Sequence, residues 1–158
     1  MKIADRVHLL AGSLGTGMSH PADCNVYGID CGDAFILIDA GVGQDSEFLL
    51  GNLAQDGIEL DRVSHLPLTH GHLEHSGGAC YLRDRFKLKV CASHETAFSL
   101  EAGNEQAISL DQAKAAGGYP QECQFQACLV DQRLADGQKL QFEAGEGSPA
   151  GGHSQRSL

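Results

Sequence analysis

Blocks of apolar and polar residues alternate along this chain and predict strands and helices in turn. Short apolar runs, which are typical of strands, occur at residues 7–10, 25–29, 34–38, 63–68 and 88–92. The turn residues 31–33 separate two of these runs and predict a hairpin, and the unbroken apolar character of 34–38 predicts a strand buried on both faces. Two more strands are expected at 125–130 and 139–142, around a turn at Asp136 and Gly137.

Apolar residues at helical spacing predict the remaining elements. Helices are expected over 45–55 and 76–86, and residues 93–116 are expected to be mostly helical with a break near Gly103. Strands that alternate with helices, with hairpins at both ends, indicate an α/β (mixed α+β) fold in which helices pack on a mixed sheet. With 158 residues, 42% of them apolar, and no repeat or linker, residues 1–158 are interpreted as a single domain.

Charge and composition exclude several classes of protein. The formal net charge is −10, so we expect no nucleic-acid partner, because phosphate binding draws on an excess of Lys and Arg. No stretch has the length of a membrane span and none has the features of a secretory signal, which predicts a cytoplasmic protein without a membrane partner. The six cysteines form no Cys-x-x-Cys pair and are expected to be reduced thiols that pack as small apolar residues.

Three of the eight histidines fall within six residues, at His70, His72 and His75. If His70 ends a strand, His70 and His72 project to the same side, and a turn at Gly71 lets the chain bend there. His75 then lies near the start of the next helix, from which its ring can reach the same point. Two or three imidazoles around one point suit Zn²⁺ or Fe²⁺. The histidines are not four residues apart, so this is not the helical His-Glu-x-x-His motif.

A metal ion held in this way favours hydrolysis. It lowers the pKa of a bound water, which supplies hydroxide at neutral pH, and it polarises a carbonyl group. Glu74 lies inside the cluster and is the candidate catalytic residue, because it could ligate a second metal, orient water or transfer a proton. His8, His65 and His94 are interpreted as ordinary surface or core residues. For His20, in the early loop, a contact with substrate is the less favoured alternative.

At this point the sequence resembles a known family. Residues 69–78, Thr-His-Gly-His-Leu-Glu-His-Ser-Gly-Gly, resemble the signature Thr-His-x-His-x-Asp-His-x-Gly-Gly of the metallo-β-lactamase superfamily. Residues 37–41 resemble the strand-ending Asp-x-Gly of that family, and residues 152–154 resemble the segment that supplies a further histidine. The resemblance implies an αβ/βα sandwich, of which this chain holds mainly the N-terminal half, with one or two metal ions.

The resemblance also implies roles for individual residues. His70, His72 and His153 would bind the first metal, Glu74 and His75 the second, and Asp39 would support the metal-binding loops. Zinc is the expected cofactor, with iron as an alternative. Glu74 departs from the aspartate of the signature, the residues before His153 lack the usual apolar strand, and the bridging aspartate and final histidine of the family have no counterpart, so the domain looks incomplete at its C-terminus.

Three hypotheses for function follow. The preferred one is a hydrolase that acts on a small-molecule ester, thioester or lactone. The second is a mononuclear iron enzyme that resembles persulfide dioxygenases, and the third is a noncatalytic, truncated fragment that binds metal or another chain. Because a missing second sheet would leave strand edges exposed, self-association into a homo-oligomer is also expected.

Overall fold

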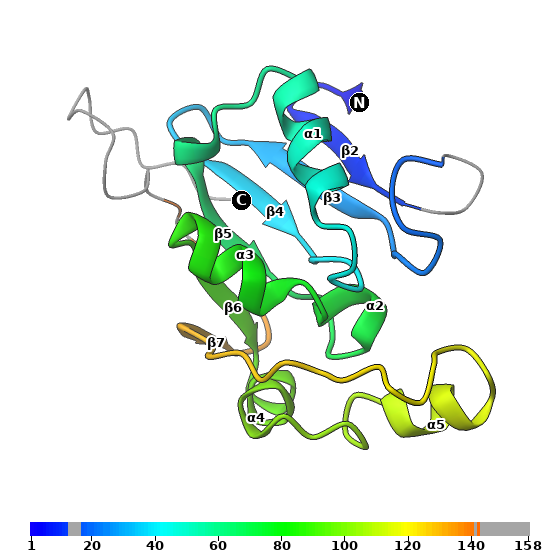
Figure 1. Cartoon of the computed structure of the whole chain (residues 1–158). Helices are drawn as coiled ribbons and strands as arrows, with labels where there is room; N and C mark the ends of the chain where they lie inside the picture. The colour runs from blue at the N-terminus through cyan, green and yellow to red at the C-terminus, as the bar shows by residue number, and fades with distance from the viewer. Residues whose placement is uncertain (13–16, 141, 143–158) are drawn as a thin grey trace.

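The computed structural model describes residues 1–12, 17–140 and 142, and these form one seven-stranded sheet (Figure 1). The strands lie side by side in sequence order, and the first four are antiparallel, whereas β4 to β7 run parallel. Their bounds are β1 (Lys2–Ala4), β2 (Val7–Ala11), β3 (Val26–Asp30), β4 (Phe35–Ile38), β5 (Val63–Pro67), β6 (Lys89–Ser93) and β7 (Gln132–Leu134). The helices are α1 (Glu47–Gln55), α2 (Leu73–Ser76), α3 (Ala79–Phe86), α4 (His94–Ala102) and α5 (Leu110–Ala115), with a 3-10 turn η1 (Leu60–Arg62).

The predicted hairpin is the β3–β4 pair. Tyr27 lies opposite Ile38, and Asp30 lies opposite Phe35 across the turn. A glycine is required in the middle of β3, because a Cβ atom on Gly28 would overlap with the ring of Phe35, which is fully buried beneath it. The hairpin therefore fixes which residues meet where β3 begins and β4 ends.

Helices α1 and α3 cover one face of the sheet (Figure 1), and the main core lies beneath them. In this core, Leu10 and Phe35 of the strands pack with Leu53 of α1 and Leu82 of α3, all with no exposed surface. The opposite face carries a smaller apolar cluster of Ala34, Ile36 and Phe142 with partly buried neighbours. This arrangement confirms the expected mixed α/β class and corresponds to one sheet of a sandwich with its helical layer.

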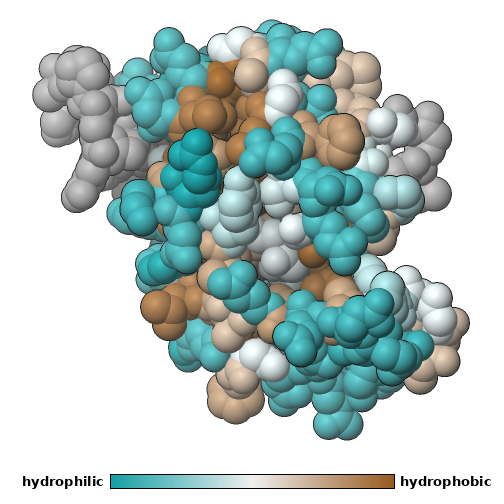
Figure 2. Space-filling view, viewed as in Figure 1, coloured by the Kyte–Doolittle hydropathy of each residue, from teal (hydrophilic) through white to brown (hydrophobic). Residues whose placement is uncertain are grey.

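The outer surface over α1 and α3 is mostly hydrophilic, with apolar residues gathered near the top of the view (Figure 2). In the part of the chain that the structure describes, five large apolar side chains are exposed: Met1, Ile3, Phe48, Phe98 and Leu129. Among the described residues, no helix combines the length and apolar character that a membrane crossing needs.

The expected strand at 125–130 is wrong, because its backbone bonds to α4 and to the loop that follows α4 instead of joining the sheet. The N–H of Cys128 donates to the carbonyl of Leu100 at 3.1 Å, and the N–H of Val130 donates to the Glu101 carboxylate at 3.2 Å. The seventh strand lies just beyond, at 132–134, parallel to β6. Residues 139, 140 and 142 also lie outside the strands, and residue 141 lies outside the described residues.

The expected helix over 76–86 is divided into α2 and α3 at Gly77 and Gly78. A Cβ atom on Gly77 would overlap with the carbonyl of Val42, and one on Gly78 would overlap with the carbonyl of Ala40. The Gly78 N–H also donates to the carbonyl of Gly41 at 3.1 Å. The two glycines thus allow the loop that follows β4 to pack directly on the helical backbone.

Candidate metal centre

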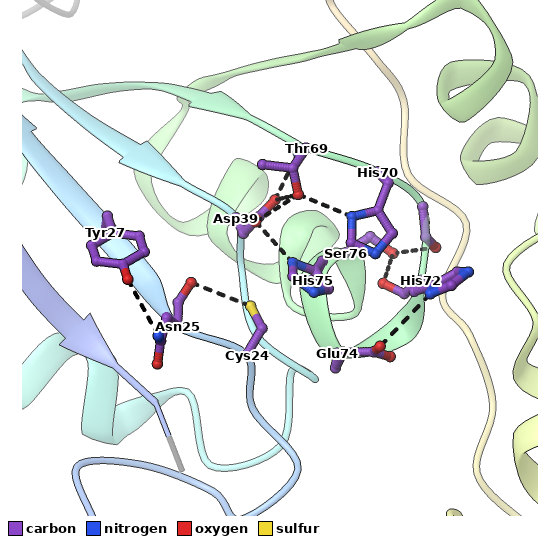
Figure 3. Close-up of polar contacts among 11 residues, drawn as sticks. Cys24, Asn25, Tyr27, Asp39, Thr69, His70, His72, Glu74, His75 and Ser76 are labelled. Atoms are coloured by element: carbon purple, nitrogen blue, oxygen red, sulfur yellow. Dashed lines mark hydrogen bonds and ion pairs between the residues drawn. The ribbon is translucent and has the colours of Figure 1, made fainter. Parts of the chain in front are cut away.

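The histidine cluster lies at the carboxyl ends of β4 and β5, where the chain turns into α2 (Figure 3). The Asp39 N–H donates to the carbonyl of Pro67 at 3.0 Å, which joins the ends of the two strands. The Ala40 N–H donates to the carbonyl of His75 at 2.7 Å, which joins the same loop to α2. Parallel strands bring their carboxyl ends to one edge, so residues 30 positions apart meet here.

Asp39 organises this edge. Its side chain is almost fully buried and its backbone is left-handed, with φ of 66°. Its carboxylate accepts hydrogen bonds from the N–H of Thr69 at 2.8 Å, from the hydroxyl of Thr69 at 2.8 Å and from Nδ1 of His75 at 2.8 Å. These hydrogen bonds hold the Asp39 carboxylate in one orientation between Thr69 and His75.

These hydrogen bonds assign the protons on two imidazoles. A carboxylate only accepts, so Nδ1 of His75 carries the proton of this bond, and in the neutral ring Nε2 then has the lone pair. The Thr69 hydroxyl donates to Asp39, so it accepts from Nδ1 of His70 at 3.0 Å, which leaves Nε2 of His70 unprotonated as well. Asp39 therefore prepares both rings, one directly and one through Thr69, in the form that binds metal.

His70, Glu74 and His75 form the group best placed to hold a cation. Each offers one ligand atom, and the three atoms lie within 4.8 Å of one another. Two atoms that each lie about 2.1 Å from a zinc ion are at most about 4.2 Å apart, so a small closing movement suffices. Two imidazoles and a carboxylate are an ordinary donor set for Zn²⁺, and the residues present fit such an ion.

The sequence also predicts His72 and His153 as ligands. The ring of His72 packs edge-on against that of His70, with 4.7 Å between centroids, so the expected common side is found. Its side chain is nevertheless half exposed, with Nδ1 at 3.7 Å from Glu74 Oε1, and it lies outside the tight three-residue group. His153 lies outside the described residues.

The surroundings of His70 favour a neutral ring. Burial lowers the pKa of His70, and positive charge on His75 or His72 lowers it further. A metal ion competes with protons for an imidazole nitrogen, so a lowered pKa helps cation binding at neutral pH.

Two residues of this site, Cys24 and Tyr119, belong to no motif of the sequence. Cys24 precedes β3, and its thiol belongs to a second group with Asp39 and His75 whose ligand atoms also lie within 4.8 Å. Tyr119, in the loop after α5, hydrogen-bonds the Glu74 carboxylate; burial, followed by the charge of Glu74, raises the pKa of Tyr119 to about 12. Cys24 could have been found from the hairpin, because the start of β3 adjoins the end of β4, but no pattern marks Tyr119.

Among the remaining histidines, His8 contacts Asp56 at 2.7 Å and His65 contacts Ser64 at 2.8 Å, so both have partners away from the centre. His20 Nδ1 accepts from the N–H of Ala22 at 3.1 Å. All six cysteines are free, as expected.

An imidazole–carboxylate cluster at the carboxyl ends of strands in an α/β sheet defines a class of metal-binding protein. The sequence model of the metallo-beta-lactamase superfamily matches residues 21–157. The chain therefore belongs to the metallo-beta-lactamase superfamily, which confirms the family that its motifs indicate.

Solved structures show the same fold. A metallo-beta-lactamase of Cronobacter sakazakii with a HARLDQ motif matches with a TM-score of 0.70 and 21% identity over 92% of this chain and 50% of that chain. FEZ-1 metallo-beta-lactamase from Legionella gormanii matches with a TM-score of 0.64 and 19% identity over 78% of this chain and 44% of that chain. The chain spans half or less of the length of these structures.

Curated relatives match a shorter region. Ribonuclease J 1 of Streptococcus pyogenes is 35% identical over 74 residues, which are 43% of this chain and 13% of that protein. Ribonuclease J of Mycoplasma pneumoniae is 36% identical over 85 residues, which are 48% of this chain and 14% of that protein.

Proposed function

We propose that this chain carries the metal centre of a hydrolase that acts on a small-molecule ester, thioester or lactone. The observation that supports this most strongly is the arrangement of His70 and His75: Asp39 engages their Nδ1 atoms, directly or through Thr69, and each ring offers a ligand atom within 4.8 Å of one on Glu74. The cation, which we expect to be zinc with iron as the alternative, supplies a Lewis acid that acidifies water and polarises a carbonyl.

The protein's own residues have separate tasks in this proposal. His70 and His75 hold the cation together with Glu74, with His72 and His153 as further ligands expected from the motif. Glu74 is also the candidate for moving a proton, because its carboxylate lies at the half-exposed side of the cluster. The Tyr119 hydroxyl donates to that carboxylate and restricts where its longer side chain lies.

A second candidate function is the cleavage of nucleic acid at the same metal centre, which the similarity to the proteins named Ribonuclease J favours. A phosphodiester would use the same Lewis acid and water. Against it stands the net charge of −10, because polyanion binding draws on clusters of Lys and Arg. We therefore rank hydrolysis of a small carbonyl substrate first.

The experiment measures metal before activity. The purified chain is loaded with zinc or with ferrous iron, its metal content is determined by mass spectrometry, and it is then assayed on p-nitrophenyl acetate, bis-p-nitrophenyl phosphate and a short RNA. We expect about one zinc per chain, a sharp loss of metal in His72→Ala, and turnover of the carboxylic ester.

Other outcomes separate the alternatives. Phosphodiester or RNA cleavage with no ester turnover would select the nuclease, and iron retention with oxygen uptake on a persulfide would select the dioxygenase. Metal retention without any turnover would leave a metal-binding fragment. If a His70→Ala/His75→Ala double variant kept as much metal as the parent chain, the proposed centre would be refuted.

A further inference from the structure

Cys24, Asp39 and His75 form a side-chain cluster beside the proposed centre that the hydrolase does not use in full. Their ligand atoms lie within 4.8 Å of one another, and Asp39 Oδ2 is 2.8 Å from His75 Nδ1. Figure 3 shows Cys24 next to His75, at the start of the chain segment that enters β3. Asp39 is buried and the other two residues are partly buried, so the cluster is an enclosed set of sulfur, oxygen and nitrogen donors.

We propose that Cys24, Asp39 and His75 form a second cation position, selective for soft divalent ions such as Zn²⁺ or Cd²⁺, which shares His75 with the His70–Glu74–His75 centre. The position goes beyond the proposed hydrolysis, because it needs a thiolate ligand that the hydrolytic centre does not.

The backbone holds Cys24 in place. The antiparallel register that sets Tyr27 opposite Ile38 brings the residues before β3 against those after β4. Asp23 Oδ1 accepts from the N–H of Val42 at 2.8 Å, and the Cys24 N–H donates to the carbonyl of Glu74 at 3.2 Å. Cys24 is therefore tied both to the loop that carries Asp39 and to the helix that carries His75, which keeps the three donors together without a cation.

Charge around the thiol also favours a cation. The carboxylates of Asp39, Asp23 and Glu74 place negative charge around the Cys24 thiol. The same negative charges attract a divalent ion. When it binds, a metal–sulfur bond forms, the S–H bond breaks and the proton leaves to solvent. Thiolate, imidazole and carboxylate together are ligands of Zn²⁺, and the thiolate selects softer ions over Mg²⁺ or Ca²⁺.

Sharing His75 makes the two positions compete. In the structure, Nδ1 of His75 donates to Asp39 at 2.8 Å, and His75 also belongs to the group with His70 and Glu74. A cation that bonds Nδ1 of His75 displaces the proton of this nitrogen, which moves to Nε2 or leaves to solvent, so the cation alters the ring on which the neighbouring centre depends. A soft ion at Cys24 should therefore lower the affinity of the histidine centre for its own ion.

The experiment titrates Co²⁺ and Cd²⁺ into the whole chain and into Cys24→Ser, with Cys31→Ser at the opposite end of β3 as the matched control. Sulfur-to-metal charge-transfer absorption in the ultraviolet reports thiolate ligation, and the visible bands of Co²⁺ report ligation as a whole. We expect the ultraviolet band in the parent chain and in Cys31→Ser, its loss in Cys24→Ser, and an affinity for Cd²⁺ that is at least about tenfold weaker in Cys24→Ser.

The other possible outcomes decide whether the Cys24 position exists. Visible bands without a sulfur band in the parent chain would overturn the soft-ion position and leave the proposed hydrolytic centre standing. A sulfur band that survives in Cys24→Ser would also overturn it. A sulfur band that persists in His70→Ala while the visible spectrum changes would support two positions, and no Co²⁺ binding at all would refute both. Slower alkylation of Cys24 in the presence of Cd²⁺, mapped by mass spectrometry on the unaltered chain, tests the same contact without a variant.

Discussion

Asp39→Asn is the sharpest perturbation of the candidate centre, because it changes charge and proton positions with little change in shape. Asparagine tolerates the left-handed backbone of residue 39, so the fold of the loop is kept. The amide oxygen can still accept from the Thr69 N–H, but an N–H₂ group now stands where Oδ2 accepts from His75. Nδ1 of His75 must then become the acceptor, which moves its proton to Nε2 and blocks the lone pair.

Two effects of different size follow from this change. Hydrogen bonds to a charged group contribute about 1.5–3 kcal/mol each, and most of them are replaced rather than lost, so we expect the free energy of unfolding to fall by about 1–3 kcal/mol. A partner of a metal-binding histidine is worth about 10–100-fold in metal affinity. We therefore expect zinc affinity to fall by at least about tenfold, equivalent to about 1.4 kcal/mol.

The assay is a competition titration of zinc against a chromogenic chelator, alongside urea unfolding and nitrogen-15 NMR of the imidazoles. Asp30→Asn is the control, since Asp30 bonds to Arg62 at the other end of the β3–β4 hairpin and should change stability without changing zinc affinity. The reasoning is refuted if Asp39→Asn binds zinc as tightly as the parent chain, or if both variants weaken zinc binding equally.

Three further predictions test the centre, the core and the acid stability. Glu74→Asp should keep or raise the metal content measured per chain, because it restores the carboxylate of the family signature; a complete loss would mean that the centre is built around the longer side chain. Gly28→Ala should lower the free energy of unfolding, measured by urea titration, by about 1–3 kcal/mol because its methyl group collides with the core. The control Gly51→Ala, on the open side of α1, should be neutral or stabilising by up to about 1 kcal/mol. Burial would raise the pKa of Asp131, but hydrogen bonds from Arg83 and from a backbone N–H outweigh burial and hold this pKa below the ordinary value of 3.8. The carboxylate therefore stabilises the fold at neutral pH, and this stabilisation is lost as the pH falls through the lowered pKa. Asp131→Asn should therefore show a shallower fall in Tm below about pH 4 than the parent chain, and an unchanged slope would contradict this.

Local pattern predicted most of the sheet because burial and periodicity agree there. The apolar runs that became β2, β4, β5 and β6 each place side chains in a core, and the predicted helix at 45–55 is observed as α1. The sequence does not predict the first strand, since Lys2–Ala4 is exposed at each of its residues and buries no side chain when it pairs with β2. Exposed edge strands carry no alternation that a sequence reader can use.

Side-chain acceptors explain the strand that failed. Residues 125–130 have the composition of a strand, but carboxylates take up their amides: Glu105 accepts from the N–H of Phe125 at 3.4 Å, and Glu101 accepts from that of Val130. These acceptors lie 20 to 29 residues away in sequence, so only the tertiary structure brings them into range.

The candidate centre was predictable where chemistry is concentrated in one segment. His70, Glu74 and His75 lie within six residues, and the structure brings their ligand atoms together. Cys24 and Tyr119 come from segments far along the chain, and their places depend on the hairpin register and on the loop after α5. Composition alone indicated a packing role for Cys24, and its position near Asp39 gives it a chemical environment that composition does not encode.

The contact between Gly77–Gly78 and the loop after β4 has a consequence for any redesign of this protein. The loop rests on bare backbone, with room for a hydrogen atom and nothing larger on either glycine. A library that varies the ligands to change the metal or the reaction must leave both glycines untouched, because even alanine would push the loop, and Asp39 with it, away from α2. Two residues without functional groups thus limit the range of centres that this scaffold can accept as firmly as the ligands themselves.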